Sequence, residues 1–573
     1  MANYYLDNPD ILFYMKHLDM DEMIRLKEEN FEQAKEYAEA PRNGEDAREN
    51  YHLVLSILGE ICAEQIAPLA AEADESGAQF HNGQVTYAEP TQKAIKLLAD
   101  AELMGFTLPR KYGGLNFPIT IYSIATEIVS QADAGLQNIF GLQEIGATIN
   151  DYADEDVRAE FLPEFSSGKV TGAMVLTEPD AGSDLQAVQL KATYDEAEDC
   201  WRLNGMKRFI TNGNAEVALI LARSEEGTTD GRGLSMFLYR KDDSVVVRRI
   251  ENKLGIHASP TCELQYNNTK AILIGKRRMG LIRYVMALMN GARLGIACQG
   301  LGIAQAAYNE AYKYANEREQ FKQKIIDFPA VHEMLVNMKT KIEAARVLTY
   351  ETSLVVDMKK LLDEKLANDA ESVDKEMRAQ SKYYTALAAV LTPMAKLYAT
   401  EIANQVSYDA IQIHGGTGYM REFNVERHYR DARITNIYEG TSQLQVVAAI
   451  GGVLTRTLDP EFDKLEAIIG DTELKPFLEI TSHCRQLLNA TIDFVKSKND
   501  ADFTSLHARR IVEMALELYN ALLLLRYAQF SDHKKMIAQH YARDLRLKAE
   551  VHHRAIIEDD GLLNHKWREM LVD

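Results

Sequence analysis

Residues 430–445 read RDARITNIYEGTSQLQ, with a single glutamate, Glu439, between a tyrosine and a glycine. The Gly-Thr-Ser that follows can start a helix, so the pattern predicts that Glu439 stands at a break in the backbone. A solvent-exposed glutamate is the simplest interpretation. The alternative is a general base, because helix-start N–H groups would favour the charged form while Ile437 and Tyr438 would raise the pKa. A carboxylate held between those influences suits proton abstraction.

The size and composition of the chain are those of a soluble globular protein. It has 573 residues, enough for several domains, with 46% hydrophobic and 26% charged content. The formal net charge of -21 argues against a general nucleic-acid binder, which would need a basic face.

Localisation signals also favour the cytoplasm. The start of the chain lacks a basic region followed by an apolar run, so no secretory signal is predicted. The longest apolar stretches, such as VVAAIGGVL at 446–454, are too short to span a bilayer. The cysteines are odd in number and form no CxxC pair, which favours reduced thiols over disulfides or a zinc site: Cys62, Cys200, Cys262, Cys298 and Cys484.

Hydrophobic periodicity predicts a mainly α protein with a central antiparallel β domain. Short segments rich in β-branched and aromatic residues, such as EVALILARS and GLSMFLYRK, follow one another without helical crossovers, which argues against a parallel Rossmann sheet. The predicted division has five parts: a lead segment (1–44), a helical domain (45–169), a β domain (170–278), a helical bundle that carries Glu439 (279–455) and an extra helical block (460–573).

Two glycine motifs could bind phosphate. GLGIAQ at 300–305 lies inside a helical pattern, so close helix packing is favoured over a dinucleotide turn. HGGTGY at 414–419 falls in a break between helices, where exposed N–H groups could cradle an anion or simply link the helices.

Two loop motifs could approach a ligand. LTEPDAGSD at 176–184 ends a probable strand and offers Thr177 and Ser183 hydroxyls beside Gly182, although a plain turn would look the same. FITNG at 209–213 places Phe209 and Thr211 at spacing two on a strand, hence on one face, as a half-buried strand also would.

Together these segments resemble the acyl-CoA dehydrogenase family. Seven motifs occur in the family's order between about residues 100 and 452: LPRKYGG, LTEPDAGSD, KRFITNG, NKLGIHASPT, the ARLGIACQG helix with REQF, IQIHGGTGY and RDARITNIYEGTSQLQ. The HASPT and FPAVHEML stretches, the long lead and the C-terminal block are similar to a larger bacterial subgroup that includes 3-methylmercaptopropionyl-CoA dehydrogenases. The family fold is a helical domain, a β domain and a helical bundle.

The resemblance implies a bound FAD. Thr177, Gly182 and Ser183 would line the flavin and the start of the CoA chain, with Phe209 against the ring and Thr211 at its edge. The ADP half would be held from a neighbouring subunit by Arg318, Phe321, Gln412 and Gly416, and the cofactor shell would be completed by Thr441 and Gln443. Ser183, Arg293 and Gly440 would contact substrate.

The resemblance also implies a reaction. Glu439 would remove the α-proton of an acyl-CoA while flavin N5 takes the β-hydride, in fatty-acid β-oxidation, with electrons passing to an electron-transfer flavoprotein. Some relatives carry the base just before the arginine matching Arg293, where this chain has Ala292. A homodimer or homotetramer is implied.

Departures from the family and other interpretations remain. Phe209 stands where the family often has Trp, Lys322 where Gly is usual and Pro329 where Gln is often found. The changes at Lys322 and Pro329 weaken the assignment of residues to the adenosine half of FAD. An acyl-CoA oxidase would share the base and the flavin. A DNA-associated flavoprotein would use the locally basic run at 533–554 in the C-terminal block. The acyl chain, the electron acceptor, the role of that block and the choice between dimer and tetramer stay open.

Overall fold

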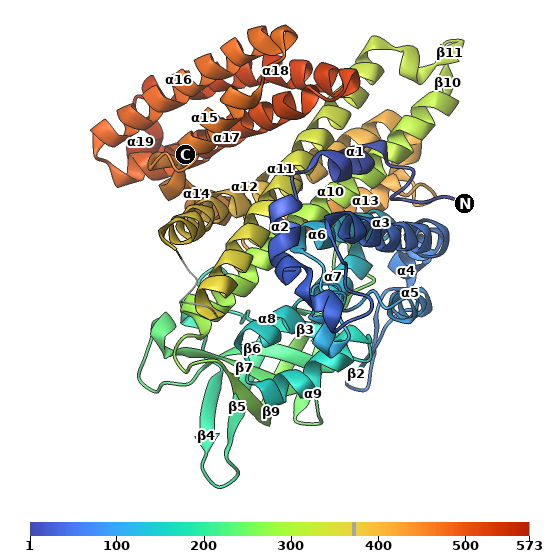
Figure 1. Cartoon of the computed structure of the whole chain (residues 1–573), viewed down its shortest axis with the longest axis vertical. Coiled ribbons are helices and arrows are strands. Elements are labelled where there is room, and N and C mark those ends of the chain that lie inside the picture. Colours follow the sequence, from blue (N-terminus) through green and yellow to red (C-terminus); the bar gives the residue numbers. More distant parts are fainter. Residues whose placement is uncertain (369–373, 572–573) are drawn as a thin grey trace. The chain divides into compact units, whose positions relative to one another are not determined.

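The computed structural model describes residues 1–368 and 374–571 (Figure 1). By their contacts these residues group into two units. Unit 1 comprises Met1–Phe13, Asp19–Glu317 and Ala403–Glu439, and unit 2 comprises Tyr14–Leu18, Arg318–Ile402 and Gly440–Asp573. The units follow spatial contacts rather than consecutive sequence, and the five-segment division stays a prediction.

The helices of unit 1 begin where polar side chains can cap them. Asn43 accepts hydrogen bonds from two N–H groups at the start of α3, and Asp133 does the same for α7. The helices before the sheet are α2 (Asp21–Lys27), α3 (Gly44–Ile61), α4 (Ala70–Ser76), α5 (Glu89–Asp100), α6 (Ile119–Ala132), α7 (Ala134–Leu142), α8 (Ile145–Tyr152) and α9 (Glu155–Ser166). Helix α1 (Pro9–His17) is assigned to unit 1 up to Phe13 and to unit 2 from Tyr14.

Helix α6 is the buried centre of the helical part of unit 1, since every residue from Thr120 to Ala132 is buried. It packs against α10 (Met286–Glu317), which in turn contacts α13 (Val425–Thr435). A Cβ added to Gly302 of α10 would come within 2.5 Å of the Ser130 Cβ on α6. Gly302 of the GLGIAQ motif therefore serves helix packing, as predicted.

The β domain of unit 1 is a sheet that closes on itself. Its order is β3-β6-β4-β5-β9-β7, with β8 beside β9 and β7 also paired with β6. The strands are β3 (Gly172–Val175), β4 (Lys191–Asp195), β5 (Cys200–Thr211), β6 (Val217–Arg223), β7 (Leu234–Arg240), β8 (Val245–Ile250) and β9 (Thr261–Ile274). Most pairs are antiparallel, but β3 and β4 run parallel to β6, so the predicted antiparallel domain is a mixed sheet.

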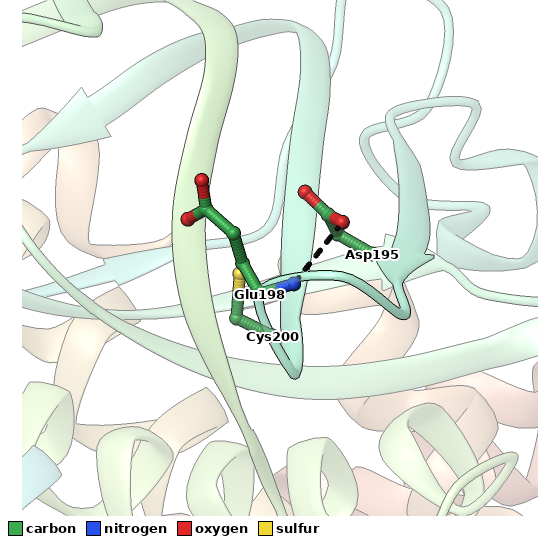
Figure 2. Close-up of side chains that lie close together, drawn as sticks. All are labelled: Asp195, Glu198 and Cys200. Carbon is green, nitrogen blue, oxygen red and sulfur yellow. Dashed lines mark hydrogen bonds between the residues drawn. The ribbon is translucent and has the colours of Figure 1, made fainter.

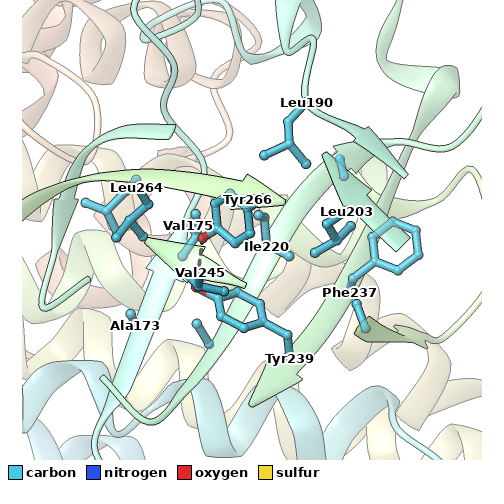
Figure 3. Packing of buried hydrophobic residues seen from close by; sticks show 14 of the residues in the cluster. Ala173, Val175, Leu190, Leu203, Ile220, Phe237, Tyr239, Val245, Leu264 and Tyr266 are labelled. Atoms are coloured by element: carbon cyan, nitrogen blue, oxygen red, sulfur yellow. Dashed lines mark hydrogen bonds between the residues drawn. The ribbon is translucent and has the colours of Figure 1, made fainter. Parts of the chain in front are cut away.

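Strand β6 is buried along its whole length because both of its faces are covered. Ala218 and Ile220 belong to the core enclosed by the sheet (Figure 3), where the Tyr239 and Tyr266 hydroxyls share a 2.7 Å hydrogen bond. Val217 and Leu219 pack instead with side chains of α8 and α9. A short hairpin, β1 (Gln79–His81) and β2 (Gln84–Thr86), was not predicted.

Unit 2 is helical apart from a small hairpin, β10 (Glu319–Gln320) and β11 (Gln323–Lys324). Its helices are α11 (Pro329–Asn368), α12 (Lys375–His414), which continues into unit 1, α14 (Ser442–Leu454), α15 (Asp459–Ile468), α16 (Lys475–Lys498), α17 (Ala501–Ala528), α18 (Asp532–Ile557) and α19 (Leu562–Leu571). Helix α17 is the most buried of the extension and packs against α11, α14, α16 and α18. The mainly α fold with a C-terminal helical extension is thus confirmed.

The basic run at 533–554 lies on α18 and is largely paired with acidic groups of unit 2. Lys534 contacts Glu343 at 2.5 Å, and Lys548 contacts Glu517 at 2.8 Å. Lys535 contacts both Asp471 and Glu473. The run therefore forms intramolecular ion pairs more than a free basic face.

Two helical stretches, 44–76 and 280–317, are long and apolar enough to cross a membrane by length and composition alone. Both pack against α6 in unit 1, as core helices do. The apolar helix α14 is shorter than a bilayer requires.

Candidate functional site

Glu439 lies just beyond the end of α13, at the predicted backbone break. The helix ends at Thr435, and Glu439 has a φ of 53°, in the left-handed region that few non-glycine residues adopt. Its side chain is half-buried. Gly440 follows with a φ of 88°, and α14 then starts at Ser442.

The residue before Glu439 is held by a buried polar network. The Tyr438 hydroxyl donates to Gln299 Oε1 on α10 and to Asn138 Oδ1 on α7, the latter at 3.2 Å. Gln299 Nε2 donates to the Ala134 carbonyl at 2.8 Å, and Asn138 Nδ2 donates to Ser259 Oγ at 2.9 Å. Because burial raises the pKa of Tyr438, the phenol stays protonated and keeps donating.

Arg293 on α10 brings a positive charge near Glu439. The guanidinium is 8% exposed, and its Nη1 donates to Asn290 Oδ1 at 3.1 Å. Nε is buried and has no hydrogen-bond partner within residues 1–368 and 374–571. Burial lowers the pKa of Arg293, and the Glu439 carboxylate opposes that shift, so the two groups interact electrostatically.

The NKLGIHASPT loop supports the same region from the sheet side. The Ile256 N–H donates to the Asp431 carboxylate of α13 at 2.5 Å. Lys253 Nζ donates to the Ile256 and Ser259 carbonyls at 2.8 and 2.5 Å, which fixes the shape of the loop. The motif was used only for the family resemblance, and none of these supporting roles was predicted. The charged and hydroxyl residues within the motif are the signal that could have indicated them.

A second network joins the loop to α13 and α4. Asp74 pairs with His257 Nδ1 at 2.8 Å and with Arg430 at 2.6 Å. Arg430 also pairs with Glu426 at 2.7 Å. Sequence reasoning missed this network, because Asp74 is far from the other residues along the chain.

The LTEPDAGSD loop is held rigidly at its base. Buried Lys207 donates to the Leu176 carbonyl at 2.7 Å and pairs with Glu178 at 2.9 Å. The Thr177 carbonyl accepts from the Arg208 N–H at 2.9 Å. Beyond this anchored base, Gly182 and Ser183 are exposed at the tip.

Phe209 is presented by a bulge rather than by a regular strand. The β5–β9 register shifts between Lys207 and Ile210, and Phe209 has a φ of 60°. The regular spacing of a strand therefore does not apply at Phe209, and a shared face for Phe209 and Thr211 stays a prediction. The Phe209 ring is 52% exposed, with the Arg208 guanidinium 4.7 Å from its centroid.

Gln412 and Gly416 lie far from Glu439. Gln412 is exposed on the last turn of α12, and Gly416 is in the short turn Gly415–Tyr419. This turn is held to the distal end of α10, where Thr417 Oγ1 donates to the Tyr314 hydroxyl at 3.1 Å. Arg293 and Tyr314 are roughly 30 Å apart along the helix. Unit 1 therefore does not bring these two residues to the carboxylate.

The remaining candidates lie in unit 2. Phe321 is 89% exposed, and together with Lys322 it forms the two-residue turn between β10 and β11. Both have positive φ, which explains why glycine suits position 322. The Thr441 side chain caps the start of α14. The Gly440 carbonyl accepts a hydrogen bond from Lys396 Nζ at 2.7 Å. Arg318 and Gln443 are exposed.

A cluster on the β4–β5 hairpin could suggest a metal. Asp195, Glu198 and Cys200 have ligand atoms within 4.8 Å of one another (Figure 2). Arg202 already pairs with Asp195 at 3.4 Å and with Glu198 at 2.5 Å. The cluster is thus accounted for as an ion-paired hairpin.

Comparison with known proteins covers most of the chain. The sequence matches the descriptions "Acyl-CoA dehydrogenase" N-terminal domain over 49–169, middle domain over 173–269, C-terminal domain over 282–450, and "Acyl-CoA dehydrogenase C terminal" over 457–556. The 3-methylmercaptopropionyl-CoA dehydrogenase of Ruegeria pomeroyi is 32% identical over 477 residues, covering 78% of this chain and 76% of that protein. The short-chain specific acyl-CoA dehydrogenase of Clostridium acetobutylicum is 32% identical over 70% of this chain and 97% of its own length.

Solved structures agree with these matches. Butyryl-CoA dehydrogenase from Megasphaera elsdenii is 29% identical with a TM-score of 0.60, over 70% of this chain and 98% of that chain. An acyl-CoA dehydrogenase from Bacillus anthracis, solved in complex with FAD, shares the fold with a TM-score of 0.76 at 23% identity, over 91% of this chain and 90% of that chain. The chain therefore belongs to the acyl-CoA dehydrogenase family of FAD-dependent oxidoreductases.

Proposed function

We propose that Glu439 is the general base that removes the α-proton of an acyl-CoA thioester. The observation that carries this proposal is the half-buried carboxylate at a left-handed break, next to the anchored Tyr438 and within the field of Arg293. Ala292, at the other position used for the base in the family, cannot abstract a proton. A positioned base typically contributes about 10²–10⁴ in rate.

Removal of a weakly acidic α-proton also requires stabilisation of the charge that develops on the thioester oxygen. The Glu439 N–H is the proposed protein donor, and such preorganised donors contribute about 3–4 kcal/mol each. The left-handed backbone at Glu439 would let one residue supply both base and donor. Ser183, Arg293 and Gly440 are the proposed substrate contacts.

The residues assigned to FAD fit a flat ring followed by a diphosphate. Phe209 leaves half of its aromatic surface exposed, and Gly182 projects at a loop tip. A Cβ at Gly415 or Gly416 would meet nothing within 4 Å, so this turn leaves room for a ligand. FAD, when bound, accepts the β-hydride; the chain's proposed role is to hold it through Thr177, Gly182, Ser183, Phe209, Thr211, Thr441 and Gln443.

The separation between the turn at Gly416 and the Glu439 region supports a homo-oligomer. This turn lies roughly 30 Å along α10 from Arg293, so it does not reach the ADP half of an FAD bound beside Glu439 of the same subunit. We therefore assign Arg318, Phe321, Gln412 and Gly416 to the ADP half of a neighbouring subunit's FAD. We propose a cytoplasmic homodimer or homotetramer acting in β-oxidation.

Glu439→Gln tests the base. The FAD-loaded variant is expected to keep its yellow absorbance but to lose at least about 100-fold in turnover across a panel of acyl-CoAs, with ferrocenium as acceptor. Glu422→Gln, an exposed glutamate before α13, is the matched control. Near-normal turnover by Glu439→Gln would refute the assignment.

We further propose an electron-transfer flavoprotein as the acceptor. A structure reported with the electron transferring flavoprotein of Acidaminococcus fermentans is 31% identical with a TM-score of 0.60, over 70% of this chain and 97% of that chain. The test compares reduction of such a flavoprotein with hydrogen peroxide formation in air. Peroxide as the main product would instead identify an oxidase.

A further inference from the structure

The residue after Glu439 is held through its backbone, as the residue before it is held through its side chain. The Gly440 carbonyl accepts two hydrogen bonds, from Lys396 Nζ at 2.7 Å and from Gln445 Nε2 at 2.8 Å. A carbonyl oxygen has two lone pairs, so these donors can use both. Lys396 belongs to α12 and Gln445 to α14, so two separate helices converge on this one oxygen.

Both donors are completely buried. Lys396 and Gln445 are each 0% exposed. A lysine ammonium is rarely buried, because its removal from water is costly unless hydrogen bonds or an ion pair compensate it. A hydrogen bond from a charged donor is also stronger than one between neutral groups. The bond from Lys396 is therefore the stronger of the two restraints on Gly440.

The glycine at position 440 is the reason that such restraints matter. Gly440 has a φ of 88°, and glycine adopts left-handed and right-handed conformations about equally well. An unrestrained glycine directly after Glu439 would act as a hinge and let the glutamate leave its unfavourable φ of 53°. Holding the Gly440 carbonyl removes that freedom. A Cβ at this position would also come within 2.8 Å of Gln445 Nε2, so glycine leaves the room that the second donor needs.

The two helices that carry these donors are joined to each other within unit 2. A Cβ at Gly452 of α14 would come within 2.1 Å of the Val390 side chain on α12, so the helices are in close contact there. Ser442 Oγ, in the first turn of α14, donates to the Glu401 carboxylate on α12. Because Lys396 lies between Val390 and Glu401 along α12, its backbone is fixed against α14 from both sides.

Glu439 therefore stands between two restrained neighbours. The Tyr438 hydroxyl is held within unit 1, and the Gly440 carbonyl is held within unit 2. We propose that Lys396 and Gln445 are positioning residues, which keep the Glu439 carboxylate in the orientation that proton abstraction requires by fixing the Gly440 carbonyl. This inference rests on the proposed role of Glu439 as the base.

Lys396→Met tests this role, because methionine is similar in length but cannot donate to the carbonyl. The measurement is the rate constant of flavin bleaching when the FAD-loaded full chain is mixed with an acyl-CoA in the absence of oxygen. It should fall at least about tenfold, since a misplacement of about 1 Å can cost about 100-fold in rate. The Kd of the enoyl-CoA product, measured from the change in flavin absorbance, should stay that of the wild type, because Lys396 holds the base and not the ligand.

The same measurement separates positioning from a purely structural role. A variant that is only less stable contains fewer folded molecules, so the amplitude of bleaching falls while the rate constant of the folded molecules stays unchanged. Lys534→Met is the matched control, because it removes another buried lysine of unit 2, whose partner is Glu343. This control should lower at most the amplitude.

Gln445→Leu keeps the test decisive if Lys396→Met does not fold. It removes the neutral donor to the same carbonyl and should also lower the rate constant, by a smaller factor than the loss of the charged donor. A wild-type rate constant in whichever of these two variants folds, or an equal loss of rate constant in Lys534→Met, would overturn the inference. Failure of the proposed function has a different signature, which is near-normal turnover by Glu439→Gln.

Discussion

At the residue scale, the chemistry depends on a glutamate in an unfavourable backbone conformation. A non-glycine residue in the left-handed region typically costs about 1–3 kcal/mol and persists when its surroundings hold it there. Here the buried hydroxyl of Tyr438, bound to Gln299 and Asn138, provides that restraint directly before Glu439.

Tyr438→Phe should therefore affect both stability and turnover. Loss of the hydroxyl leaves the buried Gln299 Oε1 without this donor, although Asn138 Oδ1 still accepts from Gln299 Nε2, so we expect about 1–3 kcal/mol less stability in urea unfolding. Turnover should fall while the flavin is retained, because Glu439 loses its restraint. Tyr429→Phe, on the exposed side of α13, should change neither. Unaltered turnover in Tyr438→Phe would show that the network is only structural.

His257 should make stability depend on pH in a defined direction. Its hydrogen bond to Asp74 raises the pKa of His257 despite burial. Burial raises the pKa of Asp74, but bonds from His257 and Arg430 outweigh this and hold it below its usual range. The raised pKa means that the pair stabilises the fold fully below about pH 6.5 and loses this effect as pH rises through the folded-state pKa.

The measurement is the Tm difference between wild type and His257→Gln across this window. It should be larger at about pH 6 than at about pH 9. His533→Gln, an exposed histidine at the start of α18, is the control and should show no such trend. A difference that grows with pH would contradict the assigned ion pair.

At the element scale, the position of α10 against α6 matters most in unit 1, because α10 carries Arg293 and Gln299 toward the Glu439 segment. The close approach depends on Gly302, where a Cβ would meet Ser130 Cβ at 2.5 Å and Gln131 N at 2.8 Å. The backbone there is buried and has no room to give.

Gly302→Ala should accordingly lower the free energy of unfolding by about 1–3 kcal/mol. Gly291→Ala on the same helix is the matched control, since its Cβ meets nothing within 4 Å and alanine should raise stability by up to about 1 kcal/mol. Denaturant unfolding of both variants measures the difference. A harmless Gly302→Ala would mean that the helices can separate without penalty.

At the scale of the whole molecule, the C-terminal extension is joined to the rest of unit 2 by a buried ion pair. Lys534 on α18 is 4% exposed and contacts the fully buried Glu343 of α11 at 2.5 Å. Lys339 at 3.1 Å and the Tyr14 hydroxyl at 3.2 Å also reach Glu343. The extension is therefore part of the unit 2 core.

Lys534→Met should destabilise unit 2 by about 3 kcal/mol, because it leaves Glu343 buried with less compensation. Lys548→Met, at an exposed lysine further along α18 with a surface pair to Glu517, should leave the unfolding midpoint nearly unchanged. Limited proteolysis should release the extension faster from Lys534→Met than from Lys548→Met. Equal rates in the two variants would rule out a buried anchor.

The sequence alone determined the fold class, the family and the candidate base. Local patterns were sufficient because helix caps, strand periodicity and the break at Glu439 depend on residues adjacent in the chain. Segment order was enough to identify the family. The structure decided what joins distant segments: the parallel strands beside β6, the bulge at Phe209 and the Tyr438 network. These depend on packing between residues far apart along the chain, which neither propensity nor spacing encodes.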